Sequence, residues 1–387
     1  MIIESLELKN YRNYGELSLS FDPGTNLLYG DNAQGKTNIL EALYYCASAK
    51  SHRGSKDREI IRFGEEEAHV KLILRKRDVP YRIDMHLKKN SAKGIAVNGM
   101  PIRRASELFG ILNAVLFSPE DLNIIKNGPS DRRRFMDLEL CQLNRSYVHA
   151  LVSYNRALVQ RNRLLKDISF QPELRETLDL WDSQLVNYGS QLIRERRAFL
   201  ARLNPVIGPI HAGLTGGKEE ISVIYDGNTD EQEFGNSLMR TRESDLRQKI
   251  TSVGPHRDDI GFFVKRTDAE ASLAAVPSDR RGMDLRRYGS QGQQRTAALS
   301  LKLSEIGLME QTTGESPVLL LDDVLSELDT DRQKQLLRTI SRIQTVITST
   351  GMENLLGRDF RIDRTFEVRN GAVYEADGSN VREGGSL

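Results

Sequence analysis

Hydrophobic and polar residues alternate along the first third of the chain. Three stretches carry an apolar residue at every second position, which is the period of half-buried strands. These stretches are Leu17–Phe21, Val70–Leu74 and Tyr81–Leu87. Between two short β-prone segments lies Asn98-Gly99, a dipeptide typical of a two-residue hairpin turn. This part of the chain is therefore predicted to form an antiparallel sheet.

The period changes to that of helices from about residue 120. Apolar residues three and four positions apart predict two helices, over Tyr147–Leu165 and Leu174–Leu203, separated by a break at Pro172. We expect an antiparallel hairpin whose second helix is roughly 45 Å long at 1.5 Å per residue. A glycine-rich loop is predicted over Gly208–Gly217, and the last third of the chain alternates helix and strand.

Composition limits the classes of function without selecting one. The chain has 387 residues, 39% hydrophobic and 28% charged, and two or three folded lobes are expected. The sequence contains no apolar run of about 18 residues and no secretory signal, so a cytoplasmic protein without a membrane span is predicted. Cys46 and Cys141 are too few for a disulfide framework and are interpreted as core residues. The net charge of +1 gives no overall preference for nucleic acid.

A phosphate-binding loop is the strongest single signal. The pattern G-x-x-x-x-G-K-T follows a short apolar segment and precedes a predicted helix, the context that such a loop requires. Its glycines let backbone N–H groups surround phosphates, while Lys36 reaches the β and γ oxygens and Thr37 offers its hydroxyl to Mg²⁺. An ordinary glycine-rich turn is the competing interpretation. The predicted nucleotide-binding residues are Gly30, Asp31, Asn32, Ala33, Gln34, Gly35, Lys36, Thr37 and Asn38.

A second signal is the apolar run Val318–Leu321, which is followed by Asp322 and Asp323. Four consecutive apolar residues predict a strand that is buried on both faces of a parallel or mixed sheet. Carboxylates at its end would lie beside the phosphate loop, with Asp322 as a Mg²⁺ partner and Asp323 polarising the attacking water. Strands also often end at an aspartate in an ordinary turn.

A third signal is Ser290-Gln291-Gly292-Gln293 at the start of an apolar helix. Ser290 supplies a hydroxyl, Gly292 a backbone that a ligand can approach closely, and the helix start a positive dipole end. Together with Gln293 these groups suit the γ-phosphate of a nucleotide. An ordinary serine cap is the alternative.

In this order, with Ser326–Asp329 as a further loop, the three signals resemble ABC-type ATPase heads. More narrowly, the sequence resembles the RecF family of DNA replication and repair proteins. The segments that carry this resemblance are Asn10–Tyr14, Phe117–Leu122, Arg132–Asp137, Gly254–Asp259 and Tyr288–Thr296. The resemblance implies a two-lobed α/β head. Lobe I would comprise residues 1–115 and 290–387, contain a mixed sheet and bind ATP. Lobe II would comprise residues 116–289, be largely helical with the predicted hairpin, and lead into the Ser290–Gln293 signature.

The resemblance also implies ATP and Mg²⁺ as cofactors and an ATP-dependent homodimer. Each ATP would lie between the phosphate loop of one subunit and the Ser290 segment of the other, with Arg12 among the nucleotide contacts. Lys36, Ser290 and Asp323 are the predicted catalytic residues. Because ABC heads commonly carry glutamate at the position of Asp323, slow hydrolysis that acts as a release switch is expected. A switch histidine is missing, and Thr348 and Ser349 are candidates to replace it.

By the same resemblance, the partners are double-stranded and gapped DNA, RecR, and through it RecO and the RecA recombinase. Arginine clusters are candidate contacts for DNA phosphates, although such runs are often solvated faces. The predicted DNA-binding cluster is Arg132, Arg133 and Arg134; two further groups are Arg194, Arg196 and Arg197, and Arg280, Arg281, Arg286 and Arg287.

Two other classes of protein share parts of this pattern. The ATPase subunit of a membrane transporter has the same head, but the β-rich start, the Ser-Gln-Gly-Gln signature and the helical hairpin count against it. A P-loop kinase for small molecules needs neither a signature helix nor a dimer.

Overall fold

A computed structural model describes residues 1–267, 282–351 and 361–376, which form two compact units. Unit 1 comprises Met1–Pro119 and Met309–Leu387, and unit 2 comprises Glu120–Leu308. These boundaries differ from the predicted ones at residues 115 and 290. The second differs more because most of helix α9 (Gln291–Thr313) packs within unit 2.

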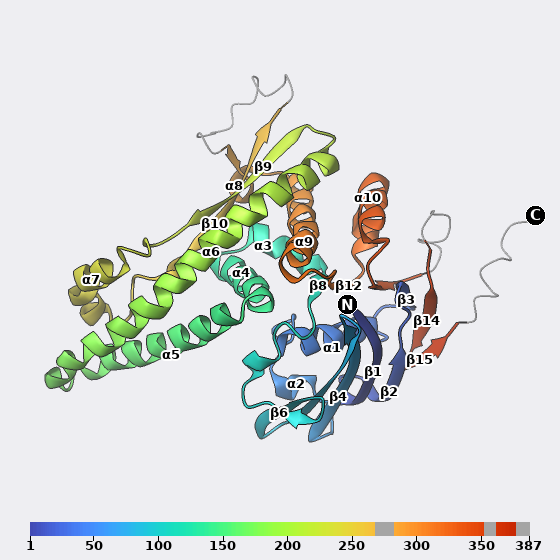
Figure 1. Cartoon of the computed structure of the whole chain (residues 1–387), viewed down its shortest axis with the longest axis horizontal. Coiled ribbons are helices and arrows are strands. Elements are labelled where there is room, and N and C mark those ends of the chain that lie inside the picture. The colour runs from blue at the N-terminus through green and yellow to red at the C-terminus, as the bar shows by residue number, and fades with distance from the viewer. Residues whose placement is uncertain (268–281, 352–360, 377–387) are drawn as a thin grey trace, which may run out of the picture. The chain divides into compact units, whose positions relative to one another are not determined.

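Unit 1 contains an antiparallel sheet in the order β2-β1-β4-β5-β6-β7 (Figure 1). The predicted alternation is confirmed, since Val70, Leu72 and Leu74 are buried while the residues between them are partly exposed. The hairpin turn is confirmed as well. Asn98 and Gly99 both have positive φ, as a tight two-residue turn needs. The strands are β1 (Ile2–Tyr11), β2 (Tyr14–Ser20), β4 (Glu67–Lys76), β5 (Val79–Lys88), β6 (Ser91–Val97) and β7 (Met100–Pro101).

The second sheet of unit 1 has the order β15-β14-β3-β13-β12-β8 and is parallel except for the β14–β15 pair. Its strand β12, between β13 and β8, is fully buried, as the apolar run predicted. Helix α1 contacts both sheets, and 11 of its 13 residues are buried, so its first turn is firmly placed. The strands are β3 (Thr25–Tyr29), β8 (Ala114–Phe117), β12 (Val318–Leu321), β13 (Thr345–Ser349), β14 (Arg364–Arg369) and β15 (Ala372–Glu375). The helices are α1 (Lys36–Ser48), α2 (Asp57–Ile60), η1 (Ala105–Glu107), η6 (Val324–Glu327) and α10 (Thr330–Ile340), with η2 (Pro119–Asp121) at the boundary.

Unit 2 is mainly helical, with a three-stranded sheet in the order β11-β10-β9. Helices α5 and α6 lie side by side as the predicted antiparallel hairpin (Figure 1). The helices are α3 (Leu122–Lys126), α4 (Pro129–Leu143), α5 (Arg145–Asp167), η3 (Pro172–Thr177), α6 (Leu178–Thr215), α7 (Phe234–Gln248), η4 (Pro255–Arg257), α8 (Leu285–Tyr288) and α9. The strands are β9 (Glu219–Asp226), β10 (Asp259–Arg266) and β11 (Met283–Asp284).

Helix α6 is longer than predicted. It has 38 residues, roughly 57 Å, and continues through Pro205 and Pro209 to Thr215, so the loop predicted from Gly208 is wrong for most of its length. Each proline removes one backbone donor, but the buried apolar face, including Ile207, packs against β9 and keeps the helix intact. The chain turns at Gly216, in the left-handed conformation that glycine adopts without strain.

Both cysteines are buried free thiols, as expected of core residues. Within the described ranges, no helix combines the length and apolarity that crossing a bilayer requires.

Candidate functional site

The phosphate loop connects β3 to α1 in unit 1, as the sequence predicted. Gly30 has φ 146° and Gly35 has φ 115°, in the region that favours glycine. A Cβ on Gly30 would lie 2.3 Å from the carbonyl oxygen of Val368, and one on Gly35 would lie 2.5 Å from the Asn13 side chain. Any larger residue would therefore displace the loop from its neighbours. Asp31, Asn32 and Ala33, between the glycines, are exposed.

Lys36 folds back over this loop. Its Nζ donates to the carbonyl oxygens of Gly30 at 2.6 Å and Asp31 at 2.8 Å. Burial lowers the pKa of Lys36, and the negative charges of Asp323 and Asp322 partly offset this effect. The ammonium group is thus held by backbone carbonyls, whose hydrogen bonds a phosphate group can replace.

Asp322 lies at the end of β12, next to the first turn of α1. Thr37 Oγ1 donates to Asp322 Oδ1 at 2.8 Å, and Thr348 Oγ1 donates to the same oxygen at 3.0 Å. Burial raises the pKa of Asp322, while the two hydroxyl hydrogen bonds act in the opposite direction. Asp323, half-buried, donates its backbone N–H to Thr348 Oγ1 at 2.9 Å. A hydroxyl and a carboxylate oxygen thus lie together, which is the ligand chemistry that Mg²⁺ prefers.

The two candidates for the missing switch residue differ in their contacts. Thr348 bonds Asp322 and Asp323, whereas the Ser349 hydroxyl donates to the carbonyl oxygen of Gly351 at 2.8 Å. Of the two, Thr348 is the one in contact with the carboxylate cluster.

The Asn10–Tyr14 segment braces the loop from one side. Asn13 Nδ2 donates to the Gln34 carbonyl at 2.9 Å, and its Oδ1 accepts from Asn38 Nδ2 at 2.8 Å. Arg12 donates to both carboxylate oxygens of Glu41, at 2.8 and 2.6 Å. Burial works against the charge of Arg12, but Glu41 outweighs it and the pKa of Arg12 is raised. Sequence analysis missed Glu41, because a glutamate in a helix 29 residues away gives no sign of its partner.

The signature residues belong to unit 2. Ser290 N donates to Gln293 Oε1 at 2.9 Å and Gln293 N donates to Ser290 Oγ at 3.2 Å, which is a reciprocal cap of α9. Gln293 Nε2 also donates to Glu219 at 2.7 Å. Ser290 and Gly292 are exposed. The serine is thus a helix cap whose surface remains accessible to a ligand.

The arginine clusters are not uniform surfaces. Arg132 is 2% exposed and donates to both carboxylate oxygens of Asp259, at 2.6 and 2.8 Å. This arrangement gives Arg132 a structural role in place of the predicted DNA contact, because its guanidinium is buried and paired. Arg133 is half-buried and donates to the Asp258 carbonyl at 2.6 Å, whereas Arg134 is exposed.

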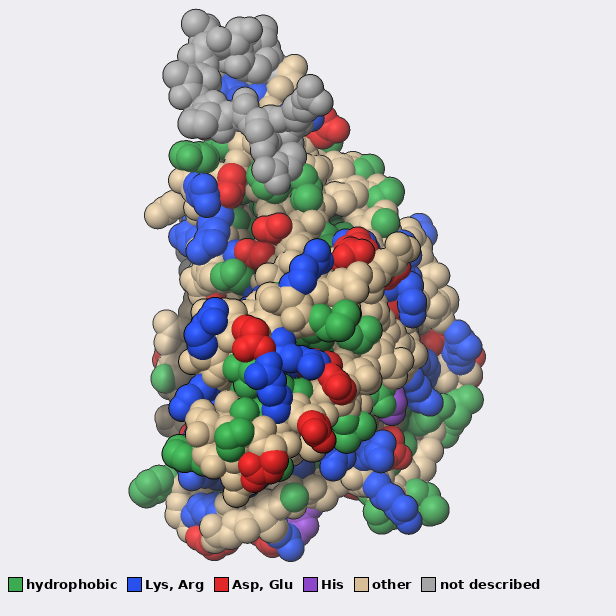
Figure 2. Space-filling view, turned by 90° about the vertical axis from the view of Figure 1, so that its left-hand side faces the viewer, with side chains coloured by type: hydrophobic (Ala, Val, Ile, Leu, Met, Phe, Trp, Pro, Cys, Tyr) green, Lys and Arg blue, Asp and Glu red, His purple; other side chains and the backbone are tan. Residues whose placement is uncertain are grey.

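The group that contains Arg194, Arg196 and Arg197 gives a similar result, whereas Arg286 and Arg287 of the third group are both exposed. Arg196 is buried between Asp137 and Asp258, and Arg197 pairs with Asp230 at the surface. Arg280 and Arg281 lie outside the described residues. On the face shown in Figure 2, basic and acidic side chains are interspersed.

His256, in the Gly254–Asp259 segment, is also a structural residue here. Its Nδ1 lies 2.7 Å from the Tyr154 hydroxyl and its Nε2 lies 3.0 Å from the Thr251 carbonyl. Burial lowers the pKa of His256 to about 4. This segment supplies Asp259 to the buried Arg132 and Asp258 to the buried Arg196, a role that sequence analysis did not find.

Comparisons with known proteins cover nearly the whole chain. Residues 2–374 match the family described as RecF/RecN/SMC N terminal domain. The DNA replication and repair protein RecF of Lachnoclostridium phytofermentans is 55% identical over 373 residues, covering 96% of this chain and 99% of that protein. A solved structure of the recombination mediator protein RecF with ATP is 35% identical, has a TM-score of 0.87, and covers 97% of each chain.

A more distant structure shows the same fold. It is an Smc head domain with an extended coiled coil, bound to the C-terminal domain of ScpA from Pyrococcus furiosus. It is 17% identical, with a TM-score of 0.54, over 97% of this chain and 95% of that one.

Together these matches define a two-lobed α/β ATPase head of the ABC type, as expected from the motifs. The chain belongs to the RecF family of DNA replication and repair proteins. A transporter subunit and a small-molecule kinase are therefore set aside.

Proposed function

We propose that this protein is an ATP-dependent DNA-binding switch of recombinational repair and replication. The observation that carries the proposal is the cluster of Lys36, Thr37 and Asp322, with the Thr37 hydroxyl 2.8 Å from the Asp322 carboxylate, in a chain of the RecF family. The ATP in the similar RecF structure supports the nucleotide, and the names of the relatives support the process.

Thr37 and Asp322 are the proposed Mg²⁺ ligands. The structure fits that ion because both side chains offer oxygen atoms and because burial raises the pKa of Asp322, an effect that a bound cation would oppose. Mg²⁺, when bound, supplies charge that offsets the negative phosphates. Lys36 exchanges its loop carbonyls for phosphate oxygens, and Asp323 orients the attacking water. The aspartate side chain is one methylene shorter than glutamate, which favours slow hydrolysis.

The signature residues complete the site of a second subunit in this proposal. Ser290, Gly292 and Gln293 begin a 23-residue helix whose N-terminal N–H groups attract a γ-phosphate. ATP shared in this way holds a homodimer together, and its hydrolysis removes the contacts and opens the dimer.

Double-stranded and gapped DNA is the proposed ligand of the dimer. RecR, and through it RecO and RecA, are proposed partners. The similar RecF structure is described as a recombination mediator in the RecFOR pathway, which supports RecR and RecO. The protein would act in the cytoplasm, where the bacterial relatives keep their DNA. Arg133 and Arg134 stay candidate phosphate contacts.

The test is fluorescence anisotropy of a labelled duplex at fixed salt, titrated with protein, with and without ATP and Mg²⁺. We expect ATP to strengthen binding by the wild type and by the surface control Lys88→Met. The variant Lys36→Met is expected to lose the ATP effect and to keep the weak nucleotide-free binding. Equal binding with and without ATP in the wild type would contradict the switch.

A further inference from the structure

A cluster of metal-ligating side chains lies on the antiparallel sheet of unit 1 and shares no residue with the phosphate loop. It consists of Glu67 and His69 on β4 and His86 on β5. One ligand atom from each side chain lies within 4.8 Å of the other two. In the described part of the chain, it is the one group of three such side chains that converges in this way.

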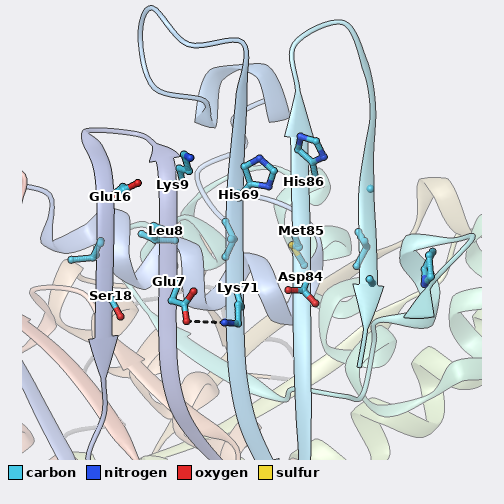
Figure 3. Close-up of a pocket in the computed structure, with 16 residues that line it drawn as sticks. Glu7, Leu8, Lys9, Glu16, Ser18, His69, Lys71, Asp84, Met85 and His86 are labelled. Carbon is cyan, nitrogen blue, oxygen red and sulfur yellow. Dashed lines mark hydrogen bonds and ion pairs between the residues drawn. The ribbon is translucent and has the colours of Figure 1, made fainter. Parts of the chain in front are cut away.

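The strand pattern dictates this convergence. Ala68 and Val70 on β4, and Met85 and Leu87 on β5, are buried in the core, so the residues between them project to the opposite face. His69 and His86 are direct cross-strand partners. Figure 3 shows both imidazoles on the same side of the sheet. The cluster lies on β4 and β5, two interior strands of a six-stranded sheet. The sheet is therefore a rigid scaffold for the three side chains.

The distances suit a small cation. His86 Nε2 lies 2.8 Å from one Glu67 oxygen, and His69 Nε2 lies 3.6 Å from the other. With Zn–N and Zn–O bonds of about 2.0–2.1 Å, neighbouring ligand atoms of a tetrahedron are about 3.3 Å apart. The two imidazole rings are stacked with centroids 4.1 Å apart. Side-chain rotations that tilt the two stacked rings toward a common point would place all three ligand atoms around one ion.

The surroundings leave room for an ion. Opposite His86 on β6 stands Gly94, so no side chain covers the imidazole from that strand. All three side chains are accessible to solvent, at 50% for Glu67, 45% for His69 and 35% for His86. Two exposed cations stand on the neighbouring strands, Lys9 opposite His69 and Lys88 opposite Glu67. Their charge lowers the affinity for a metal ion and is screened by water and salt.

We propose that Glu67, His69 and His86 form a binding site for a zinc-class transition metal ion. Two imidazoles and one carboxylate favour Zn²⁺, Ni²⁺ or Cu²⁺ over Mg²⁺ and Ca²⁺, which prefer ligand sets made of oxygen atoms. Three protein ligands leave the fourth position of a tetrahedral ion open to water or to an atom of another molecule. The site is distinct from the Thr37 and Asp322 cluster, where the ligand atoms are all oxygen.

The test is calorimetric titration of the whole protein with Zn²⁺ in excess Mg²⁺, which saturates oxygen-ligand sites. Glu67→Gln, His69→Asn and His86→Asn are each expected to weaken Zn²⁺ binding by at least about tenfold, and the double histidine variant to abolish it. The control is His149→Asn, an exposed histidine of α5 in unit 2, which is expected to bind as the wild type does. Circular dichroism checks that the variants fold.

Co²⁺ provides a second readout that does not depend on stability. A tetrahedral nitrogen and oxygen site is expected to give visible absorption bands in the wild type and in His149→Asn, and not in His69→Asn. Absence of saturable Zn²⁺ binding by the wild type would overturn the proposal. So would equal Zn²⁺ affinity in the wild type and all three cluster variants.

Discussion

The two units use their charged side chains in different ways. In unit 1, Lys36 is held by carbonyl groups of its own loop, and Asp322 by two hydroxyl groups. In unit 2, two of the fully buried cations, Arg161 and Arg196, are each held by two carboxylates. The first arrangement can exchange weak internal partners for a ligand, whereas the second is already neutralised.

The network of unit 2 ties together segments that are distant in sequence. Arg161 of α5 bonds Asp182 of α6 at 2.6 Å and Asp245 of α7 at 2.8 Å. It therefore connects three helices around the hairpin. Buried ion pairs of this kind contribute little net stability compared with apolar packing, but removing one partner leaves an uncompensated charge.

Neighbouring arginines in the sequence can therefore have different structural roles, one in the core and one at the surface. Arg196 is 2% exposed, and the next residue, Arg197, is 43% exposed. A basic run on a helix presents some members to the core and others to solvent. A surface that binds phosphate cannot be inferred from the run alone.

The largest expected change in stability comes from a variant that disrupts the buried ion pairs of Arg196 in unit 2. In Arg196→Met, the fully buried carboxylate of Asp258 and the partly exposed carboxylate of Asp137 lose their cation. We expect the free energy of unfolding to fall by about 3–5 kcal/mol, measured by denaturant titration.

The matched control for that variant is its sequence neighbour. Arg197 donates to Asp230 at 2.7 Å, but both side chains are more than 40% exposed. Arg197→Met is therefore expected to change stability by less than about 1 kcal/mol. Similar losses in the two variants would show that burial does not separate the two kinds of arginine.

The next effect concerns the unit 1 cluster. Asp322→Asn removes the charge that would face Mg²⁺ while keeping the size of the side chain. We expect Mg²⁺-dependent ATP affinity to fall by about 100-fold, which is about 2.7 kcal/mol. Nucleotide-free stability is expected to change much less, because the buried carboxylate is partly disfavoured already.

Titration of ATP with and without Mg²⁺ measures this effect, with Asp84→Asn on the antiparallel sheet as a control. Equal binding of ATP and Mg²⁺ by Asp322→Asn and the wild type would show that the Asp322 charge has a structural role, like the paired charges of unit 2.

The sequence predicted the features that depend on local signals, and most of these lie in unit 1. The strand–loop–helix conformation around Gly30–Thr37 and the strand β12 were predicted correctly because their signals are local: two glycines, one lysine, and four apolar residues before Asp322. The contact of Thr37 with Asp322, 285 residues apart, could be anticipated because parallel strands bring their carboxyl ends to one edge.

The remaining features depend on tertiary partners. Arg132 reads as a surface residue until Asp259, 127 positions later, is placed beside it. The extension of α6 through Pro205 and Pro209 depends on its packing against β9, which outweighs a local signal for a helix end. Neither the burial of Arg132 nor the packing of α6 against β9 produces a periodic pattern of hydrophobic residues by which it could be predicted.

A smaller effect tests whether every charge of unit 2 is satisfied. Glu139 and Glu305 are buried beside Lys302, so two carboxylates share one cation. Burial raises the pKa of Glu139 to about 7 and also raises that of Glu305. The folded protein therefore keeps a proton that the unfolded chain releases near pH 4.5. This contribution to stability is present below about pH 4.5 and is lost as the pH rises to about 7.

Glu139→Gln removes this conflict and leaves Lys302 paired with Glu305 at 2.7 Å. Relative to the wild type, we expect the variant to gain about 1–2 kcal/mol of stability at pH 8 compared with pH 4.5. Unfolding at a series of pH values measures the difference, with the exposed Glu173→Gln as a control. A difference that did not change between pH 4.5 and 8 would contradict the buried, protonated state.

The smallest expected effect on stability concerns Ser290, a polar side chain of unit 2 that is exposed to solvent. It tests whether unit 2 also contains a polar group that binds a ligand. Ser290→Ala removes the cap of α9 and is expected to cost about 1 kcal/mol of stability. Ser290→Asp keeps a capping oxygen, so its stability is expected to stay within about 0.5 kcal/mol of the wild type. Its negative charge would repel the γ-phosphate of ATP, so ATP-driven dimerisation, followed by light scattering, is expected to fail. Dimerisation of Ser290→Asp at the wild-type ATP concentration would show that this serine is a cap alone, and unit 2 would then contribute no ligand-facing serine to the site.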